Sequence, residues 1–270
     1  MKLHTFRLYQ HPSAHEVVSG IIRRHSSNPR DVREVALEGR DLSGVRDILD
    51  LGCGFGFMAE EVARRVGDGA LFTGVDALES NRLPFTRRVR AARREAHFVP
   101  VRLDGHLGWP AQSFDLVVAS YSLYFFPRTV PEIARVLRPA GNFVCLTHSE
   151  ASMRAMVRLA GVPEEDAPLL SLVRRFSAEN GAEVLGRWFG DVTRCDYPNT
   201  LHFGLHDVEE LLTYMQYKFA SMRDWPESEP ELSALAAEEL RRRILADGGL
   251  VALDKTDAVF WAAAPQRLGR

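Results

Sequence analysis

The stretch Asp47–Phe57, which reads DILDLGCGFGF, decides the fold of this chain. Its apolar first half predicts a buried strand, and Gly52, Gly54 and Gly56 predict a tight turn that leads into a helix over residues 58–66. Glycine suits such a turn because it has no Cβ, so the backbone can bend sharply and approach a ligand closely. The amides at the start of the helix would then point toward whatever lies in the turn.

Asp50 separates two kinds of glycine turn. A dinucleotide-binding turn follows G-x-G-x-x-G and rests phosphates on the start of the helix. Here the pattern is G-x-G-x-G, Phe57 stands where the last glycine of that fingerprint would be, and the Asp50 carboxylate would repel phosphates. The turn therefore favours a nucleoside-type ligand that carries an ammonium group. A strand–turn–helix without any ligand is the remaining alternative.

The pattern D-x-G-x-G-x-G resembles the first motif of the class I S-adenosylmethionine (SAM) dependent methyltransferases. This resemblance implies an α/β fold: a Rossmann-like, seven-stranded, mostly parallel sheet with helices on both faces. It also implies that SAM is the cofactor and S-adenosylhomocysteine the product. The residues of the turn that the resemblance assigns to SAM are Asp50, Gly52, Cys53, Gly54 and Gly56.

A second acidic residue follows the next predicted strand, which covers residues 71–75. Asp76 ends this strand about 20 residues after the glycine turn, the distance at which a βαβ unit delivers a carboxylate to ribose hydroxyls. Such a carboxylate makes charge-assisted hydrogen bonds. We therefore expect Asp76 and the adjoining Ala77 at the ribose. The alternative is that Asp76 only caps the helix predicted over residues 78–95.

A third strand is predicted over residues 97–101, and the residues after it match the family's adenine site. In the family, an acidic or amide side chain here accepts a hydrogen bond from the adenine amino group. The resemblance assigns this role to Asp104, with Leu103 against the adenine face and Gly105 next to it.

The apolar run 116–119 is typical of a central parallel strand. Ser120 and Tyr121 follow it, and the resemblance places them near the methionine part of SAM. Residues 138–141 predict a turn before a fifth strand over residues 142–147. His148 follows that strand, at the edge where ligands bind in open α/β sheets.

His148 and Tyr121 are the candidate catalytic residues, His148 as a base or an orienting group and Tyr121 as an orienting group. Methyl transfer depends mainly on holding the nucleophile in line with the departing sulfur. A general base adds rate when the acceptor is a hydroxyl or an acidic carbon. His11 and His15 are further candidate bases, because N-terminal helices of the family often fold over the SAM pocket.

The composition fits one α/β domain with an insertion: the chain has 270 residues, 46% apolar and 26% charged, and a formal net charge of −2. This charge creates no general attraction to nucleic acid. The three cysteines show no C-x-x-C spacing, which argues against a disulfide framework and a metal site. No apolar run reaches the about 18 residues of a transmembrane helix, and the N-terminus is polar. We expect a cytoplasmic protein that binds neither membrane nor nucleic acid.

The chain is expected to divide into four segments. An N-terminal helical lid (1–44) precedes the SAM-binding core (45–148). A helical insertion and substrate cap (149–250) follows, with a strand at 191–204 and helices near 206–221 and 231–246. A closing hairpin (251–264) completes the sheet.

The expected reaction is transfer of the methyl group from SAM to a small-molecule acceptor. Apolar and aromatic side chains of the expected cap suggest an apolar or aromatic acceptor, although they can also belong to the core. A SAM-binding protein without turnover and an NAD-dependent oxidoreductase remain as alternatives. The residues that suggest the acceptor are Met153, Met156, Phe176, Trp188, Phe203, Tyr214, Tyr217, Phe219 and Trp225.

Overall fold

The structure is a computed structural model that describes residues 12–220, 238, 241–242, 244–246 and 248–266. The chain forms two compact units. The sheet unit comprises Arg30–His148, Arg174–Tyr197 and Asp257–Arg270, and the helical unit comprises Met1–Pro29, Ser149–Val173 and Pro198–Thr256. These units cut across the expected segments, because residues 30–44 and 174–197 belong with the sheet. His11 and most of the helix expected at 231–246 lie outside the described residues.

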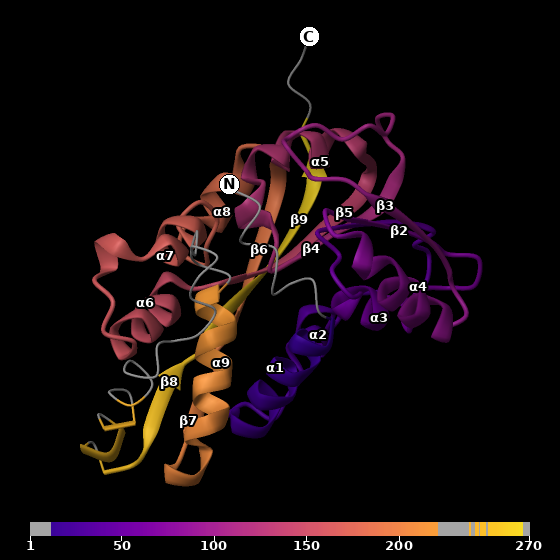
Figure 1. The fold of residues 1–270 in the computed structure, drawn as a ribbon. Helices are drawn as coiled ribbons and strands as arrows, with labels where there is room; N and C mark the ends of the chain where they lie inside the picture. The colour runs from indigo at the N-terminus through magenta and orange to yellow at the C-terminus, as the bar shows by residue number, and fades with distance from the viewer. Residues whose placement is uncertain (1–11, 221–237, 239–240, 243, 247, 267–270) are drawn as a thin grey trace. The chain divides into compact units, whose positions relative to one another are not determined.

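Seven strands form the central sheet of the sheet unit (Figure 1). The strands are β1 Asp47–Leu51, β2 Leu71–Asp76, β3 Glu95–Pro100, β4 Phe114–Ser120, β5 Leu137–His148, β6 Phe189–Tyr197 and β9 Asp257–Pro265. Their order is β3-β2-β1-β4-β5-β9-β6. Neighbours among β1 to β5 are parallel, whereas β9 runs antiparallel between β5 and β6. This arrangement confirms the Rossmann-like, mostly parallel sheet predicted from the sequence.

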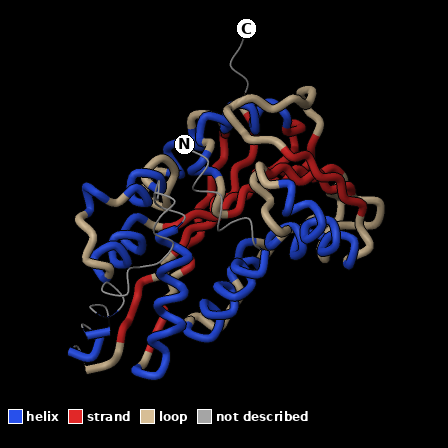
Figure 2. The backbone as a smooth tube through the Cα atoms, viewed as in Figure 1, coloured by secondary structure: helices blue, strands red, loops and turns tan. Residues whose placement is uncertain are grey.

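Helices pack on both faces of this sheet, as Figure 2 shows in blue against the red strands. Trp261 points to one face, where its Nε1–H donates to the Ala36 carbonyl at 2.7 Å. Phe260 points to the other face and lies against Gly181. The helices of the sheet unit are α2 Val32–Ala36, α3 Phe57–Ala63, α4 Arg82–Ala91, α5 Val130–Val136 and α8 Gly181–Gly186, with 3-10 turns at Glu79–Asn81, Leu123–Phe125 and Pro127–Thr129.

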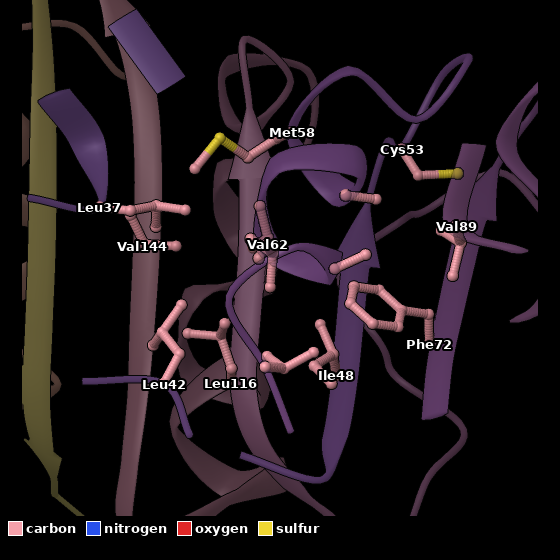
Figure 3. Packing of buried hydrophobic residues seen from close by; sticks show 14 of the residues in the cluster. Leu37, Leu42, Ile48, Cys53, Met58, Val62, Phe72, Val89, Leu116 and Val144 are labelled. Carbon is pink, nitrogen blue, oxygen red and sulfur yellow. The ribbon is translucent and has the colours of Figure 1, made fainter. Parts of the chain in front are cut away.

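An apolar cluster lies between the sheet and helices α2, α3 and α4 (Figure 3). Alternate residues of each strand point into it, because successive side chains of a strand face opposite sides. Ile48, Leu116 and Val144 come from three neighbouring strands, and Met58 and Val62 come from α3; all are at most 1% exposed. This packing holds the first turn of α3 against the carboxyl end of β1.

Residues 138–141 do not form the separate turn that the sequence predicts. They belong to β5, and the pairing of β4 with β5 jumps from Phe114–Leu137 to Leu116–Asn142, which is a bulge. Arg138 in the bulge donates to Asp115 at 2.7 Å and to Asp47 at 2.8 Å. The bulge is therefore tied to the starts of β4 and β1, which explains why the strand continues through it.

The helical unit has its own apolar core and a two-stranded sheet. Its core joins Ile21, Met156, Leu212 and Tyr214 from three helices, all at most 4% exposed. The elements are α1 Pro12–His25, α6 Glu150–Leu159, α7 Pro168–Val173, α9 Val208–Ala220, β7 Thr200–Phe203 and β8 Val251–Asp254, with 3-10 turns at Glu164–Asp166 and Leu205–Asp207.

The closing hairpin expected at 251–264 is wrong. β8 pairs with β7 in the small sheet, whereas β9 pairs with β5 and β6 in the large one. The strand expected at 191–204 divides in the same way, because β6 and β7 belong to different sheets. The Asp254 carboxylate accepts from the amide and hydroxyl of Thr256, so the chain turns between the two strands without pairing them.

Among the described residues, no helix combines the length and the apolar character that crossing a membrane requires.

Replacing Asp115 with alanine is expected to lower the free energy of unfolding by about 2 kcal/mol, because hydrogen bonds to charged groups contribute about 1.5–3 kcal/mol. Its carboxylate accepts from the amides of Arg46 and Asp47, both at 2.9 Å, and from Arg138. Urea unfolding followed by circular dichroism measures the change. Asp191→Ala, an exposed aspartate on β6, is the control and should change stability by less than about 0.5 kcal/mol. Equal effects would contradict the anchoring role of Asp115.

Candidate functional site

The glycine turn lies between β1 and α3, and all three of its glycines adopt left-handed backbone angles. Their φ values are 67° at Gly52, 50° at Gly54 and 86° at Gly56. Gly52 and Cys53 both donate their amides to the Val75 carbonyl, at 2.7 and 3.0 Å. The turn is therefore tied to the end of β2, where Asp76 lies.

The three glycines have different surroundings. A Cβ at Gly52 would lie 2.5 Å from the Cβ of Ser122, and one at Gly56 would lie 3.2 Å from the Phe85 backbone. A Cβ at Gly54 would meet no atom within 4 Å. A Cβ at Gly52 would therefore clash with Ser122, one at Gly56 would be tight against Phe85, and one at Gly54 would enter open space.

Asp50 is 2% exposed, and both of its carboxylate oxygens are buried without a hydrogen-bond partner among the described residues. Burial, together with the smaller effect of the charge of the nearby Asp76, raises the pKa of this carboxyl to about 8. A buried polar group without a partner destabilises a protein unless something else pairs with it. The site therefore offers an acceptor that suits a cationic group of a ligand.

Asp76 ends β2 and organises the turn rather than standing apart from it. Its Oδ2 accepts from the Gly54 amide at 2.9 Å, and its Oδ1 accepts from the Leu78 amide at 2.9 Å and from Asn81 Nδ2 at 3.1 Å. Burial raises the pKa of this carboxyl, while the three donors oppose the rise. Asp76 therefore lies beside Gly54 and turns the chain at Leu78, whereas no backbone amide within the 3-10 turn Glu79–Asn81 or α4 donates to it, so the structure does not show the helix-capping alternative. Ala77 follows it and is exposed.

The residues expected at the adenine lie in a loop after β3. Asp104 is exposed, and its carboxylate accepts from the amide of His106 at 3.3 Å. Leu103 is half-buried, and Gly105 has a φ of 122°. None of these observations tests the adenine assignment, which stays a prediction.

Ser120 ends β4, the strand that pairs in parallel with β1. Its Oγ is buried and has no hydrogen-bond partner among the described residues. Asp50 pairs in register with Val118, so Ser120 lies two residues further along the adjoining strand. The carboxyl edge of β1 and β4 therefore holds two unsatisfied polar side chains close in register.

Tyr121 follows Ser120 and has a φ of 53°, which is uncommon for a bulky residue without a special constraint. Its ring stacks on His148 with a centroid distance of 4.7 Å, and its hydroxyl donates to Asp257 Oδ2 at 2.8 Å. Burial raises the pKa of the Tyr121 phenol well above its usual value, and the charge of Asp257 adds to the rise. Tyr121 is therefore a protonated hydrogen-bond donor at neutral pH.

His148 ends β5 and is 4% exposed. Its Nδ1 lies 2.8 Å from Asp257 Oδ1, and Tyr124 lies on a parallel ring plane with a centroid distance of 6.2 Å. The structure thus brings together the two predicted catalytic residues, His148 and Tyr121, through a carboxylate that the sequence did not single out.

Asp257 is the main functional candidate that sequence reasoning missed. It begins β9, and it pairs in register with His148 on β5 and with Tyr197 on β6. An aspartate at the start of an otherwise apolar strand was visible in the sequence. What could not be read there is that β9 inserts antiparallel beside β5, which aligns residue 257 with residue 148.

His15, a further candidate base, lies in the helical unit. His15 contacts the Tyr217 hydroxyl through Nδ1 at 2.5 Å, and burial, followed by the charge of Lys218, lowers its pKa to about 4. The residues that suggested an apolar acceptor are mostly core. Met153, Met156, Phe176, Phe203, Tyr214 and Tyr217 are all buried, and Trp188 is half-buried. The side chain of Phe219 and the whole of Trp225 lie outside the described residues.

Residues 48–141 match the model of a family described as a methyltransferase domain. This range runs from β1 to the bulge of β5, so it contains the glycine turn, Asp76 and the loop after β3. It covers the part of the chain on which the resemblance in the sequence was strongest.

Curated relatives are methyltransferases. A nocamycin O-methyltransferase of Saccharothrix syringae is 42% identical over 36% of this chain and 35% of its own length. An aklanonic acid methyltransferase of Streptomyces is 30% identical over 48% of this chain and 66% of its own length. A demethylmenaquinone methyltransferase of Symbiobacterium thermophilum is 34% identical over 40% of this chain and 44% of its own length. The chain therefore matches between about a third and two thirds of the length of these relatives.

Solved structures share the fold at low sequence identity. A putative methyltransferase of Bacillus halodurans covers 87% of this chain and 99% of its own, with a TM-score of 0.57 and 15% identity. A phosphoethanolamine N-methyltransferase of Haemonchus contortus, in complex with SAM, covers 98% of this chain and 60% of its own, with a TM-score of 0.53 and 16% identity. A [4+2]-cyclase covers 96% of this chain and 97% of its own, with a TM-score of 0.51 and 17% identity.

The raised pKa of Asp50 predicts a pH-dependent stability in the ligand-free protein. Between the ordinary carboxyl pKa of 3.8 and about 8, the folded state holds a proton that the unfolded state has lost. The free energy of unfolding therefore falls as pH rises, by up to about 1.4 kcal/mol per pH unit. Asp50→Asn removes this contribution. The free energy of unfolding of the variant should therefore rise relative to that of the wild type from pH 5 to pH 8. Parallel curves from urea unfolding at several pH values would contradict the burial of an unpaired carboxyl.

Gly52 and Gly54 form a matched pair for testing the turn. Gly52→Ala should lower the free energy of unfolding by several kcal/mol, because overpacking costs about 1–3 kcal/mol in addition to the about 1–2 kcal/mol of a left-handed non-glycine residue. Gly54→Ala should lower the free energy of unfolding only by the about 1–2 kcal/mol of a left-handed non-glycine residue, because its Cβ would enter open space. Thermal and urea unfolding measure both. Equal losses would show that Ser122 does not restrict the turn.

Proposed function

We propose that this chain, which contains a class I SAM-dependent methyltransferase domain, is an enzyme that transfers the methyl group of SAM to a small-molecule acceptor. The observation that carries the proposal is the Asp50 carboxylate, which is buried beside the glycine turn without a partner. SAM and its product S-adenosylhomocysteine both carry an amino-acid ammonium, which supplies the missing hydrogen-bond donor.

The residues present fit this cofactor better than they fit a dinucleotide. Two carboxylates, Asp50 and Asp76, face the turn closely enough that the second raises the pKa of the first. They would attract an ammonium group and repel a pyrophosphate. Gly54 adds a backbone position where a side chain would enter open space. These features argue against the NAD-dependent oxidoreductase.

Each residue of the site has a proposed role in holding the cofactor. Asp50 accepts from its ammonium group, and Ser120 Oγ supplies a second polar contact from the adjoining strand. Asp76 holds Gly54 in place and accepts from the ribose hydroxyls. The remaining contacts that we propose on the resemblance are those of Gly52, Cys53, Gly56, Ala77, Leu103, Asp104, Gly105 and Tyr121.

The bound cofactor supplies an activated methyl group on a sulfonium, whose departure leaves a neutral thioether. The chain's own contribution is to hold the acceptor in line and, where the acceptor carries a proton, to take that proton. We propose His148 for the proton and Tyr121 for orientation. The stacked rings of the two residues keep both at the carboxyl end of the strands that flank the cofactor residues.

The acceptor is proposed as a small molecule because curated relatives are named for nocamycin, aklanonic acid and demethylmenaquinone. An apolar or aromatic acceptor remains a proposal that rests on sequence composition. The three cysteines are free and two of them are buried, which fits the reducing cytoplasm that we propose as its location.

A SAM-binding protein that transfers no methyl group is the second candidate function. The observation that keeps it is the fold shared with a [4+2]-cyclase, since a fold does not determine the reaction. Detection of any methylated product by mass spectrometry would decide for the enzyme.

Isothermal titration with S-adenosylhomocysteine tests the proposed cofactor. The wild type should bind it and should not bind NAD. Asp50→Asn should weaken binding at least about tenfold, because a hydrogen bond between charged groups contributes about 1.5–3 kcal/mol. The same variant is expected to be more stable than the wild type at pH 8, so the loss of affinity cannot come from unfolding.

Asp191→Asn, on the exposed part of β6, is the matched control and should bind S-adenosylhomocysteine like the wild type. Binding of NAD, or equal affinity of the wild type and Asp50→Asn, would refute the proposed role of the buried carboxylate.

A further inference from the structure

Three titratable side chains from three elements meet at the end of β5. Asp257, which is 1% exposed, lies between the other two. Its Oδ2 accepts from the Tyr121 hydroxyl and its Oδ1 bonds Nδ1 of His148, both at 2.8 Å. Each oxygen of one carboxylate therefore serves a different residue of the proposed catalytic pair.

This geometry determines where the imidazole carries its hydrogen. An ionised carboxylate can only accept hydrogen bonds, so Nδ1 of His148 is the donor. In a neutral imidazole with hydrogen on Nδ1, the basic lone pair is on Nε2. Tyr121 supports this state, because its protonated hydroxyl donates to the same carboxylate and thereby stabilises the ionised form.

The backbone on both sides of the pair is held in place. Ala178 donates its amide to the His148 carbonyl at 3.0 Å, and the Thr147 hydroxyl donates to the Phe176 carbonyl at 2.9 Å. On the other side, Asp257 lies between β5 and β6 and pairs in register with both. The imidazole and the carboxylate therefore keep one relative orientation.

Tyr121 shows that the surroundings impose this arrangement. Its left-handed φ of 53° is unfavourable for a residue with a Cβ. Stacking on His148 and the bond to Asp257 hold it there. Residues in such sparsely populated conformations persist where the structure over-determines them, and they cluster at active sites.

We infer that Asp257 is a positioning residue that holds His148 in the tautomer with hydrogen on Nδ1, so that Nε2 receives the proton of the methyl acceptor. The inference rests on the proposed function and adds a residue to it. In the transfer, the acceptor atom forms its bond to the methyl carbon, the carbon–sulfur bond breaks, and the electron pair stays on the sulfur. The proton of the acceptor passes to Nε2, and the carboxylate of Asp257 stabilises the imidazolium that results.

A purely structural role for Asp257 makes a different prediction. If Asp257 served only the stability of β9, its replacement would lower the stability and would leave the tautomer of His148 unchanged in the folded variant. The tautomer of His148 is therefore the readout that separates the two roles.

Long-range ¹H–¹⁵N correlation spectra of ¹⁵N-histidine-labelled protein, saturated with S-adenosylhomocysteine at pH 8, report this tautomer. His148→Gln identifies the signals by their loss. In the wild type, Nδ1 of His148 should show the shift of a protonated ring nitrogen and Nε2 that of an unprotonated one. In Asp257→Ala this pattern should be lost, with the hydrogen moving to Nε2 or averaging over both nitrogens.

Three further variants keep the test decisive. Asp257→Glu should retain the pattern because it keeps a carboxylate, and Tyr121→Phe should retain it because the bond from Asp257 to His148 remains. Asp196→Asn on the neighbouring strand β6 is exposed and serves as the control. If Asp257→Ala does not fold, the wild type and Asp257→Glu decide between the two roles.

A wild type with hydrogen on Nε2, or a pattern unchanged in folded Asp257→Ala, would overturn the inference. Asp257→Ala is also expected to bind S-adenosylhomocysteine within about threefold of the wild type. Titration separates this inference from the proposed function: normal binding with the wrong tautomer refutes only the role of Asp257, whereas absent binding in the wild type refutes the cofactor.

Discussion

The turn between β1 and α3 is the constraint on which the rest of the site depends. Gly52 donates to the Val75 carbonyl and has no room for a side chain, because Ser122 lies where its Cβ would be. This close approach joins β2, β1 and β4, which are neighbours in the sheet, at their carboxyl ends. Asp50, Asp76 and Ser120 lie at the same edge because β1, β2 and β4 are parallel, and the left-handed backbone of the glycines lets the turn pass close to them. The helices and the core behind the sheet maintain that turn.

The same edge stores electrostatic strain. Asp50 is buried without a partner, and Asp76 is near enough to raise its pKa further. A fold selected for stability alone would replace one of the two carboxyls. Stability and ligand binding therefore oppose each other at Asp50, as is common where a site is organised for a ligand that is absent in the free state. Three donors satisfy Asp76, so the strain is concentrated at one residue.

The other half of the sheet holds a second buried carboxylate, Asp257, which differs from Asp50 in its hydrogen bonds. Asp257 is as deeply buried as Asp50, yet both of its oxygens have partners. In the proposed function, Asp50 accepts from the ammonium group of the cofactor and Asp257 orients the imidazole of His148. The carboxylate without a partner, Asp50, belongs to the cofactor-binding step of the proposed reaction. The carboxylate with two partners, Asp257, belongs to the removal of the proton. The antiparallel strand β9 places Asp257 beside His148, because it brings its first residue beside the last residue of β5.

The sequence by itself determined the parallel core, the glycine turn, Asp50 and Asp76, because all of them depend on short-range patterns: an apolar strand, glycines that need a left-handed φ, and a carboxylate at a strand end. It also pointed to His148 and Tyr121 by their positions after two strands. Only the tertiary structure decided how the strands β6, β7, β8 and β9 pair. Two strands joined by a short turn have the same local sequence pattern whether they pair with each other or with strands of different sheets. Which of the two occurs depends on which other strands have unpaired edges. For this reason Asp257 could be found only once β9 was paired with β5.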